Sequence, residues 1–373
     1  NDAETISSDE TSANESKQTP TLHVSRVTEI VSVLLKQAAE KIDRVRSAAG
    51  ASLALVLQGD TSISLSPVTE VPAYKGILHS IPENPKVAAA WAAPASAFPH
   101  LAKLIAGDES ELAPYRGSLV EGFIVSAGGV GDSLGKAAGG AMIAALKETK
   151  DESSEEKSKL QLAVTATLVN VLDKRSNNDR VIVPLLRVLD QCFSSGCLTA
   201  VAPNPPQPPT PLAAAIAAKI RAELKGSRDI AKLCLGAQAL CHLAGLGKVA
   251  GLDPNSDDTS ACAKTTATHG VLALLVNRYP RVRRTAAEQL YVTLLGVGDD
   301  ETDEGVESAV ELLSTTRWDA ELAVVKPKRN LLYPMLGLLP PKLALVAAKT
   351  VSKSEKVLDE NDSYAALVGS AGY

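Results

Sequence analysis

The segment Gly131-Asp132-Ser133-Leu134-Gly135 has the residue spacing with the most obvious chemistry in this sequence. A Gly-x-Ser-x-Gly segment forms a nucleophile elbow when a strand runs into it and a helix follows, because the sharp turn exposes the serine hydroxyl. That hydroxyl attacks a carbonyl carbon only when a histidine base, oriented by an acid, removes its proton. One hypothesis is therefore a serine hydrolase with Ser133 as its nucleophile.

The other members of such a triad are not found. Hydrolases with a Gly-Asp-Ser-Leu segment need an Asp three residues before the His, and none of the five histidines meets this condition: His23, His79, His100, His242 and His269. The alternating strand and helix pattern of a hydrolase sheet is missing as well. We interpret Ser133 as a residue at the N-terminus of a helix after a glycine turn, and we expect no catalytic residue and no enzyme.

The same glycines do not predict a nucleotide or cofactor site. After Gly129 and Gly131, Leu134 stands where a dinucleotide fingerprint needs its third glycine. Lys136 is followed by Ala137, whereas a phosphate loop needs Ser or Thr there to hold magnesium. We therefore predict no bound cofactor.

The cysteines predict free thiols rather than a metal site or a disulfide scaffold. They are odd in number and widely spread: Cys192, Cys197, Cys234, Cys241 and Cys262. Their spacings of five and seven residues do not match the close pairs of structural zinc sites. We expect no metal, and reduced thiols in a cytosolic protein.

A basic cluster is the strongest candidate for binding another protein. Arg278, Arg281, Arg283 and Arg284 lie together in a chain whose net charge is −5. Arg281 and Arg284 share a helix face because they are three residues apart. The segment Val282-Arg283 resembles the Val-Arg of HEAT-like repeats, whose arginine usually pairs with a neighbouring acid. This resemblance implies a structural role for Arg283, while the other arginines could meet an acidic partner. The alternative is a solvated helix face with local salt bridges.

A second candidate is Trp318, one of two tryptophans, which precedes Asp319 at the start of a predicted helix. Trp and Arg are typical interface anchors, but a tryptophan at a helix start also packs into a core. The predicted protein-binding residues are Arg278, Arg281, Arg284, Trp318 and Asp319.

The composition indicates that helices position these residues. Ala and Leu make up more than a quarter of the 373 residues, and aromatic residues only 3%. Ala and Leu favour helices, whereas all-β folds need more β-branched and aromatic residues. The low content of aromatic residues also argues against binding of single-stranded nucleic acid by stacking. The negative net charge argues against binding of duplex DNA. No apolar run is long enough to span a membrane, so we expect neither nucleic acid nor membrane as a partner.

Helical periodicity runs through most of the chain between polar breaks. One predicted apolar face, between residues 27 and 49, contains Val27, Ile30, Val31, Leu34, Ala38, Ile42, Val45 and Ala49. Others contain Leu160, Val164, Leu168, Val171 and Leu172, and further on Val306, Ala309, Val310 and Leu313. We predict a disordered arm over 1–20, one helical-repeat domain over 21–352, and a flexible tail over 353–373. Inserted loops are expected near 151–157, 202–211, 251–261 and 297–304.

A Val-Arg-x-x-Ala pattern occurs twice, at Val45-Arg46 and again at Val282-Arg283, where Pro280 precedes it. The pattern is similar to the second helix of HEAT repeats, and Val282, Ala286 and Leu290 are expected to face inward. The predicted fold is all-α: a HEAT/armadillo-like α-solenoid of stacked antiparallel helix pairs.

Six segments, in chain order, resemble the C-terminal part of the tubulin-folding cofactor D family. They are Lys41 to Arg46; Ala93-Pro94 with Ala97-Phe98-Pro99; Val125-Ser126 with Gly128-Gly129 and Asp132-Ser133; Val183 to Leu186 with Leu189-Asp190 and Gly196-Cys197; Tyr279 to Arg283 with Tyr291 and Leu294-Leu295; and Trp318 to Val325 with Lys328-Arg329-Asn330. The proline run 203–211 and the part after Pro340 have no counterpart in this resemblance.

The resemblance implies a non-catalytic chaperone scaffold. It would bind β-tubulin or the αβ-tubulin heterodimer, together with cofactors E and C and an Arf-like small GTPase. In that assembly it would support heterodimer assembly and disassembly and tubulin GTP hydrolysis, in the cytoplasm and at microtubules. The alternatives are a HEAT-type adaptor for another cargo and the Ser133 hydrolase.

Overall fold

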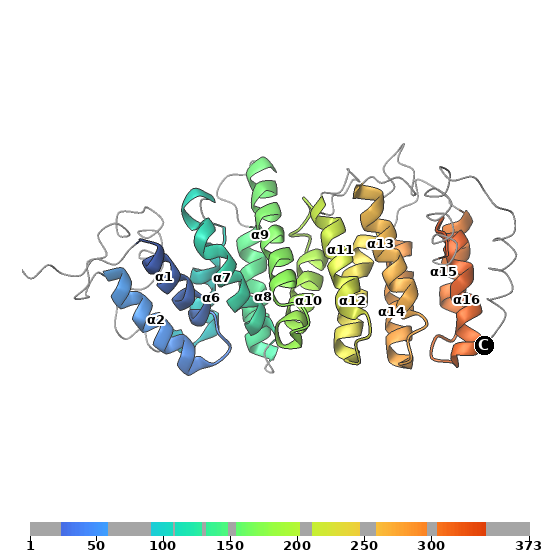
Figure 1. The fold of residues 1–373 in the computed structure, drawn as a ribbon, viewed down its shortest axis with the longest axis horizontal. Coiled ribbons are helices and arrows are strands. Elements are labelled where there is room, and N and C mark those ends of the chain that lie inside the picture. The colour runs from blue at the N-terminus through green and yellow to red at the C-terminus, as the bar shows by residue number, and fades with distance from the viewer. Residues whose placement is uncertain are drawn as a thin grey trace, which may run out of the picture. The chain divides into compact units, whose positions relative to one another are not determined.

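The computed structural model of the protein describes residues 24–58, 91–106, 109–128, 132–147, 154–201, 211–246, 259–296 and 304–340. Thirteen helices and no strand lie within these ranges. The chain divides into two compact units, Asn1–Gln191 and Cys192–Tyr373. Each unit is considered by itself below, with the helix labels of Figure 1.

The first unit contains the helices that precede the division and most of α10. Their bounds are α1 Val24–Ala38, α2 Asp43–Gln58, α6 Pro94–Lys103, α7 Glu109–Ala127, α8 Asp132–Lys147, α9 Ser154–Lys174 and α10 Asp179–Ser194. The second unit contains the end of α10 and six further helices. They are α11 Pro211–Leu224, α12 Ile230–Ala244, α13 Thr259–Leu274, α14 Pro280–Leu295, α15 Glu304–Thr315 and α16 Leu322–Met335.

In the first unit α1 packs against both α2 and α7, and α7 packs in turn against α8 and α9. The crossing of α1 and α7 is close because Gly122 has no side chain. A Cβ atom at this position would lie 2.5 Å from the carbonyl oxygen of Lys36 and 2.9 Å from the Cβ of Ala39. Glu121, the neighbouring residue, accepts ion pairs from Lys36 and Arg175, which tie α1 and the end of α9 to α7.

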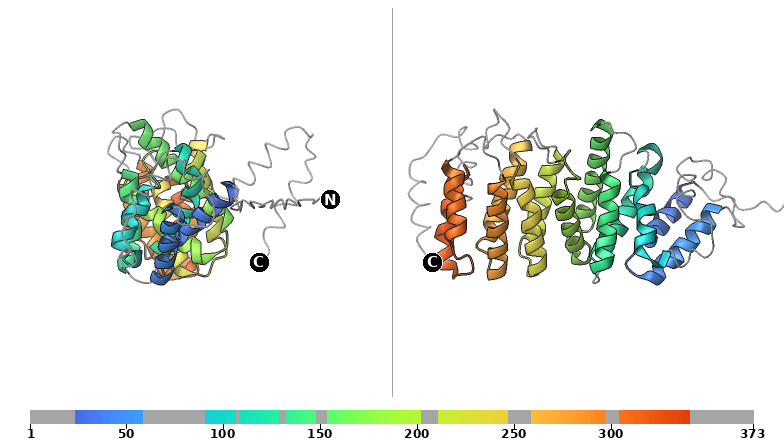
Figure 2. Two further views of the ribbon diagram at one scale, coloured as in Figure 1. Left: turned by 90° about the vertical axis from the view of Figure 1, so that its left-hand side faces the viewer. Right: turned by 180° about the vertical axis from the view of Figure 1, so that it is seen from behind.

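In the second unit each helix packs against its neighbour in sequence, and α11 and α12 also pack against the helix after that. The pairs that skip one helix are α11 with α13 and α12 with α14. This is the contact pattern of stacked helical hairpins, in which each repeat buries its apolar face against the next. Figure 1 shows α11 and α12 beside α13 and α14, and the view from behind in Figure 2 shows the same neighbours.

These elements confirm the predicted fold class, an all-α HEAT/armadillo-like solenoid of stacked antiparallel helix pairs. Two of the predicted apolar faces are confirmed as well. Leu160, Val164 and Leu168 of α9 are buried, as are Val282, Ala286 and Leu290 of α14. Ala309 and Leu313 are the buried residues of α15.

The single apolar face predicted between residues 27 and 49 is wrong. The helix ends at Ala38, a short connection follows, and α2 begins at Asp43. Ile42 lies in that connection and is exposed, while the buried residues among the described side chains of α1 are Val31, Leu35 and Ala38. Apolar residues three and four apart on both sides of a short turn imitate one continuous helix.

The predicted loops are too long at their ends. α9 begins at Ser154, inside the loop predicted near 151–157, and α13 begins at Thr259, inside that predicted near 251–261. Residues 211 and 304, the last of the other two predicted loops, are the first residues of α11 and α15. The arm over 1–20 and the tail over 353–373 lie outside the described residues.

Cys192, Cys197, Cys234 and Cys241 are free thiols. Cys192 and Cys197 are buried at the end of α10, where the Cys197 thiol also donates to the carbonyl oxygen of Cys192 over 3.3 Å. A hydrogen bond with Cys197, together with burial, raises the pKa of the Cys192 thiol well above its usual range. A thiol with a raised pKa is a poor nucleophile, so this pair packs as small apolar side chains.

Candidate functional site

The two Val-Arg-x-x-Ala segments occupy equivalent places, each in the first turn of a helix. Arg46 is the fourth residue of α2, and Arg283 is the fourth residue of α14. Both arginines are almost fully buried, with 2% of Arg46 and 3% of Arg283 exposed. A buried guanidinium is costly unless its N–H groups find acceptors, so their partners define the local structure.

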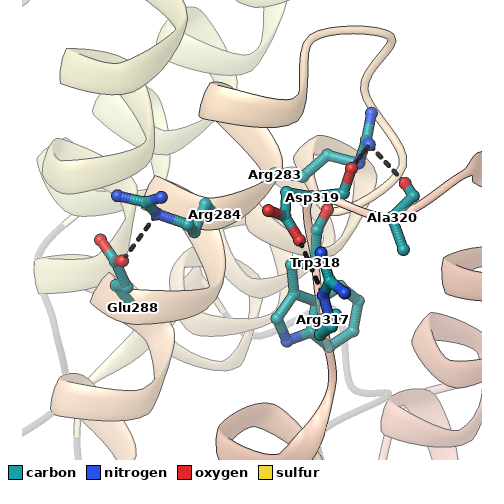
Figure 3. A network of polar contacts seen from close by, with 7 residues as sticks. All are labelled: Arg283, Arg284, Glu288, Arg317, Trp318, Asp319 and Ala320. Carbon is teal, nitrogen blue, oxygen red and sulfur yellow. Dashed lines mark hydrogen bonds and ion pairs between the residues drawn. The ribbon is translucent and has the colours of Figure 1, made fainter.

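Arg283 donates to five main-chain carbonyl oxygens on two segments of the chain. Its NH1 reaches the carbonyls of Asn277 (2.7 Å) and Arg278 (3.3 Å), just before α14. Its Nε reaches that of Trp318 (2.7 Å), and its NH2 those of Asp319 (3.0 Å) and Ala320 (2.6 Å). Figure 3 shows the side chain extending to the segment before α16, while Arg284 points away from it. We call this arrangement the Arg283 joint.

Arg46 forms the same arrangement in the first unit, which we call the Arg46 joint. Its NH1 donates to the carbonyls of Glu40 and Lys41, both at 2.8 Å. Its Nε donates to the Trp91 carbonyl (3.3 Å) and its NH2 to that of Ala92 (2.6 Å). Burial lowers the pKa of Arg46, against the opposing effect of Asp43 and Glu40.

The expectation that Arg283 is structural is thus confirmed, but the acid predicted as its partner is wrong. Its acceptors are main-chain oxygens, including that of Asp319, whose carboxylate instead lies 3.7 Å from Arg317. The planar fork of a guanidinium, with five N–H donors, suits several carbonyls at once. The acid was expected from the resemblance to HEAT-like repeats, and the positions of carbonyl oxygens cannot be read from a sequence.

Trp318 is buried, with 4% of the residue exposed, and its indole N–H donates to the Leu313 carbonyl at 2.9 Å. The structure therefore places the ring in the packing of the second unit, which is the alternative that the sequence left open. Trp91 takes the equivalent position beside Arg46 and is also buried. Sequence reasoning missed Trp91, because it lies 45 residues after Arg46 and no local pattern links the two residues.

The remaining predicted residues lie on the surface around the Arg283 joint. Arg278, Arg281, Arg284 and Asp319 are all exposed. The Arg278 guanidinium lies 5.2 Å from the centre of the Tyr279 ring, and Arg284 pairs with Glu288 at 3.2 Å across one helical turn. Arg281 makes no hydrogen bond or ion pair with the described residues. We call Arg278, Arg281 and Arg284 the arginine rim.

The arrangement favours recognition of another protein rather than catalysis. The Arg283 joint fixes the start of α14, so the rim guanidiniums extend from a rigid base. Charged groups held on a rigid helix attract an acidic surface and orient it. Whether a partner contacts the rim and Asp319 stays a prediction.

The Ser133 segment has a different geometry from a nucleophile elbow. Ser133 is exposed in the first turn of α8, and the described element before it is the helix α7 rather than a strand. The interpretation of Ser133 as a residue at a helix N-terminus is confirmed. Within the described ranges no cluster of three or more His, Cys, Asp and Glu residues could hold a metal ion. None of the described helices is both long and apolar enough to cross a membrane.

A family model with the description "Tubulin folding cofactor D C terminal" matches residues 28–232, which is more than half of the chain. The match begins at Thr28 in α1, includes the rest of the described first unit and ends at Lys232, at the start of α12. The Arg46 joint lies inside the match, and the Arg283 joint with its rim lies after it. This is a chaperone-type, non-catalytic family with tubulin folding as its context. The chain belongs to the tubulin folding cofactor D C-terminal family.

Proposed function

We propose that this chain is a non-catalytic tubulin-folding module that contacts β-tubulin or the αβ-tubulin heterodimer through the arginine rim. In this proposal residues 21–352 act as one helical-repeat domain between the arm and the tail. The module works in the cytoplasm and at microtubules, in a larger assembly with cofactors E and C and an Arf-like small GTPase. There it supports heterodimer assembly and disassembly and tubulin GTP hydrolysis.

One observation carries the choice of surface: three exposed guanidiniums lie together on a chain of net charge −5. Several basic residues elsewhere in the described chain pair with carboxylates, as Lys232 does with Glu223 at 2.7 Å. Arg281 has no such partner in the described residues, and Arg284 has only an exposed pair of little energetic value. A partner carboxylate therefore gains a charge-assisted hydrogen bond without breaking a strong one.

The test is binding of the full chain to purified αβ-tubulin, compared between two double variants of equal charge change. In R281E/R284E the charge of two rim residues is reversed. In K225E/R228E the charge of two exposed basic residues between α11 and α12 is reversed instead. We expect the rim variant to bind about 10-fold more weakly at low salt, and the difference to shrink as salt screens the charges.

The outcomes are distinct. Equal loss in both variants would show that only the net charge matters, and no loss in either would remove the rim from the interface. Absence of tubulin binding by the unaltered chain would contradict the proposed function for this chain.

A further inference from the structure

The exposed face of α14 continues beyond the arginine rim along the whole helix. Arg281, Arg284, Glu288, Val292 and Leu295 are separated by steps of three and four residues, and all five are exposed. This spacing places them in one row on a helix. From Arg281 to Leu295, which lie 14 positions apart, the row is about 21 Å long, at 1.5 Å per residue. We call these five residues the α14 stripe.

The C-terminal half of the α14 stripe is apolar. Val292 is 61% exposed and Leu295 57%, although the opposite face of the same helix buries Val282, Ala286 and Leu290. The helices packed against α14 differ: in the described parts of α12, α13 and α15 no large apolar side chain is exposed in this way. Apolar surface that a helix keeps in water, next to helices that bury theirs, indicates a contact site.

The N-terminal half of the stripe is basic. Arg281 is unpaired within the described chain, and the ion pair of Arg284 with Glu288 is fully at the surface. The stripe therefore has two chemically different ends, cationic at Arg281 and Arg284 and apolar at Val292 and Leu295.

We propose that the α14 stripe docks one amphipathic helix of the tubulin partner, with carboxylates at one end and aliphatic or aromatic side chains at the other. This inference rests on the proposed function and adds the chemistry of the bound element. A helix matches because its side chains recur at the same steps of three and four residues, so two or three turns meet both ends of the stripe. Addition of a partner strand needs a free sheet edge, and the described chain has no strand.

The two halves of the stripe should respond differently to salt, because screening weakens charge pairs and leaves apolar burial intact. The experiment measures the affinity of the full chain for αβ-tubulin at low and at high salt. Three double variants are compared: V292S/L295S, R281E/R284E and, as a matched apolar control, I42S/L55S, which alters two exposed aliphatic residues of the first unit. All the altered residues are exposed, and circular dichroism with thermal melting checks that the variants fold.

We expect V292S/L295S to weaken binding about 10-fold at both salt concentrations, from loss of two aliphatic contacts. R281E/R284E should weaken binding strongly only at low salt, and I42S/L55S should have no effect at either. If the unaltered chain binds tubulin and V292S/L295S binds equally well, the docking stripe is overturned while the proposed function stands. If the unaltered chain does not bind, both fail.

A photo-reactive benzoylphenylalanine at position 292 identifies the bound element directly. Cross-links to a tubulin helix that carries acidic and apolar residues support the proposal. Cross-links to a tubulin loop, or to residues 341–373 of the chain itself, overturn it.

Discussion

The Arg46 joint and the Arg283 joint share one design and differ in their surroundings. Both guanidiniums bind the carbonyls five and six residues before them and a Trp-containing segment further along the chain. The surface around Arg283 carries three arginines. The packing next to the arginines also differs, because α2 has glycine at position 50 where α14 has Ala287. The shared part holds helices together, and the differing part is where a partner's chemistry can be met.

The largest effect is expected when either arginine is removed. Arg283→Met leaves five buried or half-buried carbonyls without their donor, and Arg46→Met leaves four. Each substitution should lower the free energy of unfolding by about 3–5 kcal/mol. Urea denaturation measures the total loss in free energy of unfolding. Hydrogen exchange shows whether the loss is confined to the unit that contains the altered joint. Losses below about 1 kcal/mol in both variants would contradict the structural role of the joints.

The next effect separates the two joints by their packing. A Cβ atom added to Gly50 would lie 2.2 Å from the Trp91 ring, so the indole must move. Gly50→Ala should therefore cost about 1–3 kcal/mol through overpacking. At the equivalent position of α14, Ala287→Gly removes a methyl group and should cost about 1 kcal/mol through helix propensity. Thermal melting of both variants tests this, and a stabilising effect of Gly50→Ala would show that the ring has room.

A smaller difference is expected between the tryptophans. The Trp318 indole donates to Leu313, but that of Trp91 has no hydrogen-bond partner in the described chain. Trp→Phe removes similar volume in both places, and only in Trp318→Phe does a buried carbonyl lose its donor. We expect Trp318→Phe to be the more destabilising by about 1 kcal/mol. Equal losses in parallel denaturation curves would mean that the indole hydrogen bond contributes nothing.

The smallest effect on stability is expected from the rim. Arg281 and Arg284 are exposed, so R281E/R284E should change the free energy of unfolding by less than about 0.5 kcal/mol. Urea denaturation of this variant therefore shows whether the tubulin-binding result reflects the surface alone. A loss above about 1 kcal/mol would mean that the rim also supports the Arg283 joint.

Much of the fold follows from periodicity, because the buried face of a helix repeats every three to four residues. Val282, Ala286 and Leu290 were predictable for that reason, with Pro280 marking the start of α14. Periodicity fails at short turns, as at Ile42, where two helices in register look like one. It also fails to predict which face neighbouring helices leave uncovered, and so Val292 and Leu295 gave no sign of exposure.

The candidate site was predictable only where it depends on side-chain charge. The rim arginines are recognisable by their spacing in an acidic chain. The hydrogen bonds of Arg283 are not, because its acceptors are carbonyls that every residue has, and their positions depend on the folded chain. Trp318 shows the same limit, since a tryptophan at a helix start fits a core and an interface equally well.

The use of main-chain acceptors has a consequence for how such chains diverge. The segments that receive Arg46 and Arg283 share a tryptophan but differ at other positions, Glu40-Lys41 against Asn277-Arg278 and Ala92 against Asp319. Mutations in these loops leave the joint intact as long as the backbone path is kept. Side chains in these loops can therefore be substituted without loss of the joint. New binding specificity can arise at these ends of the helices while the fold is retained.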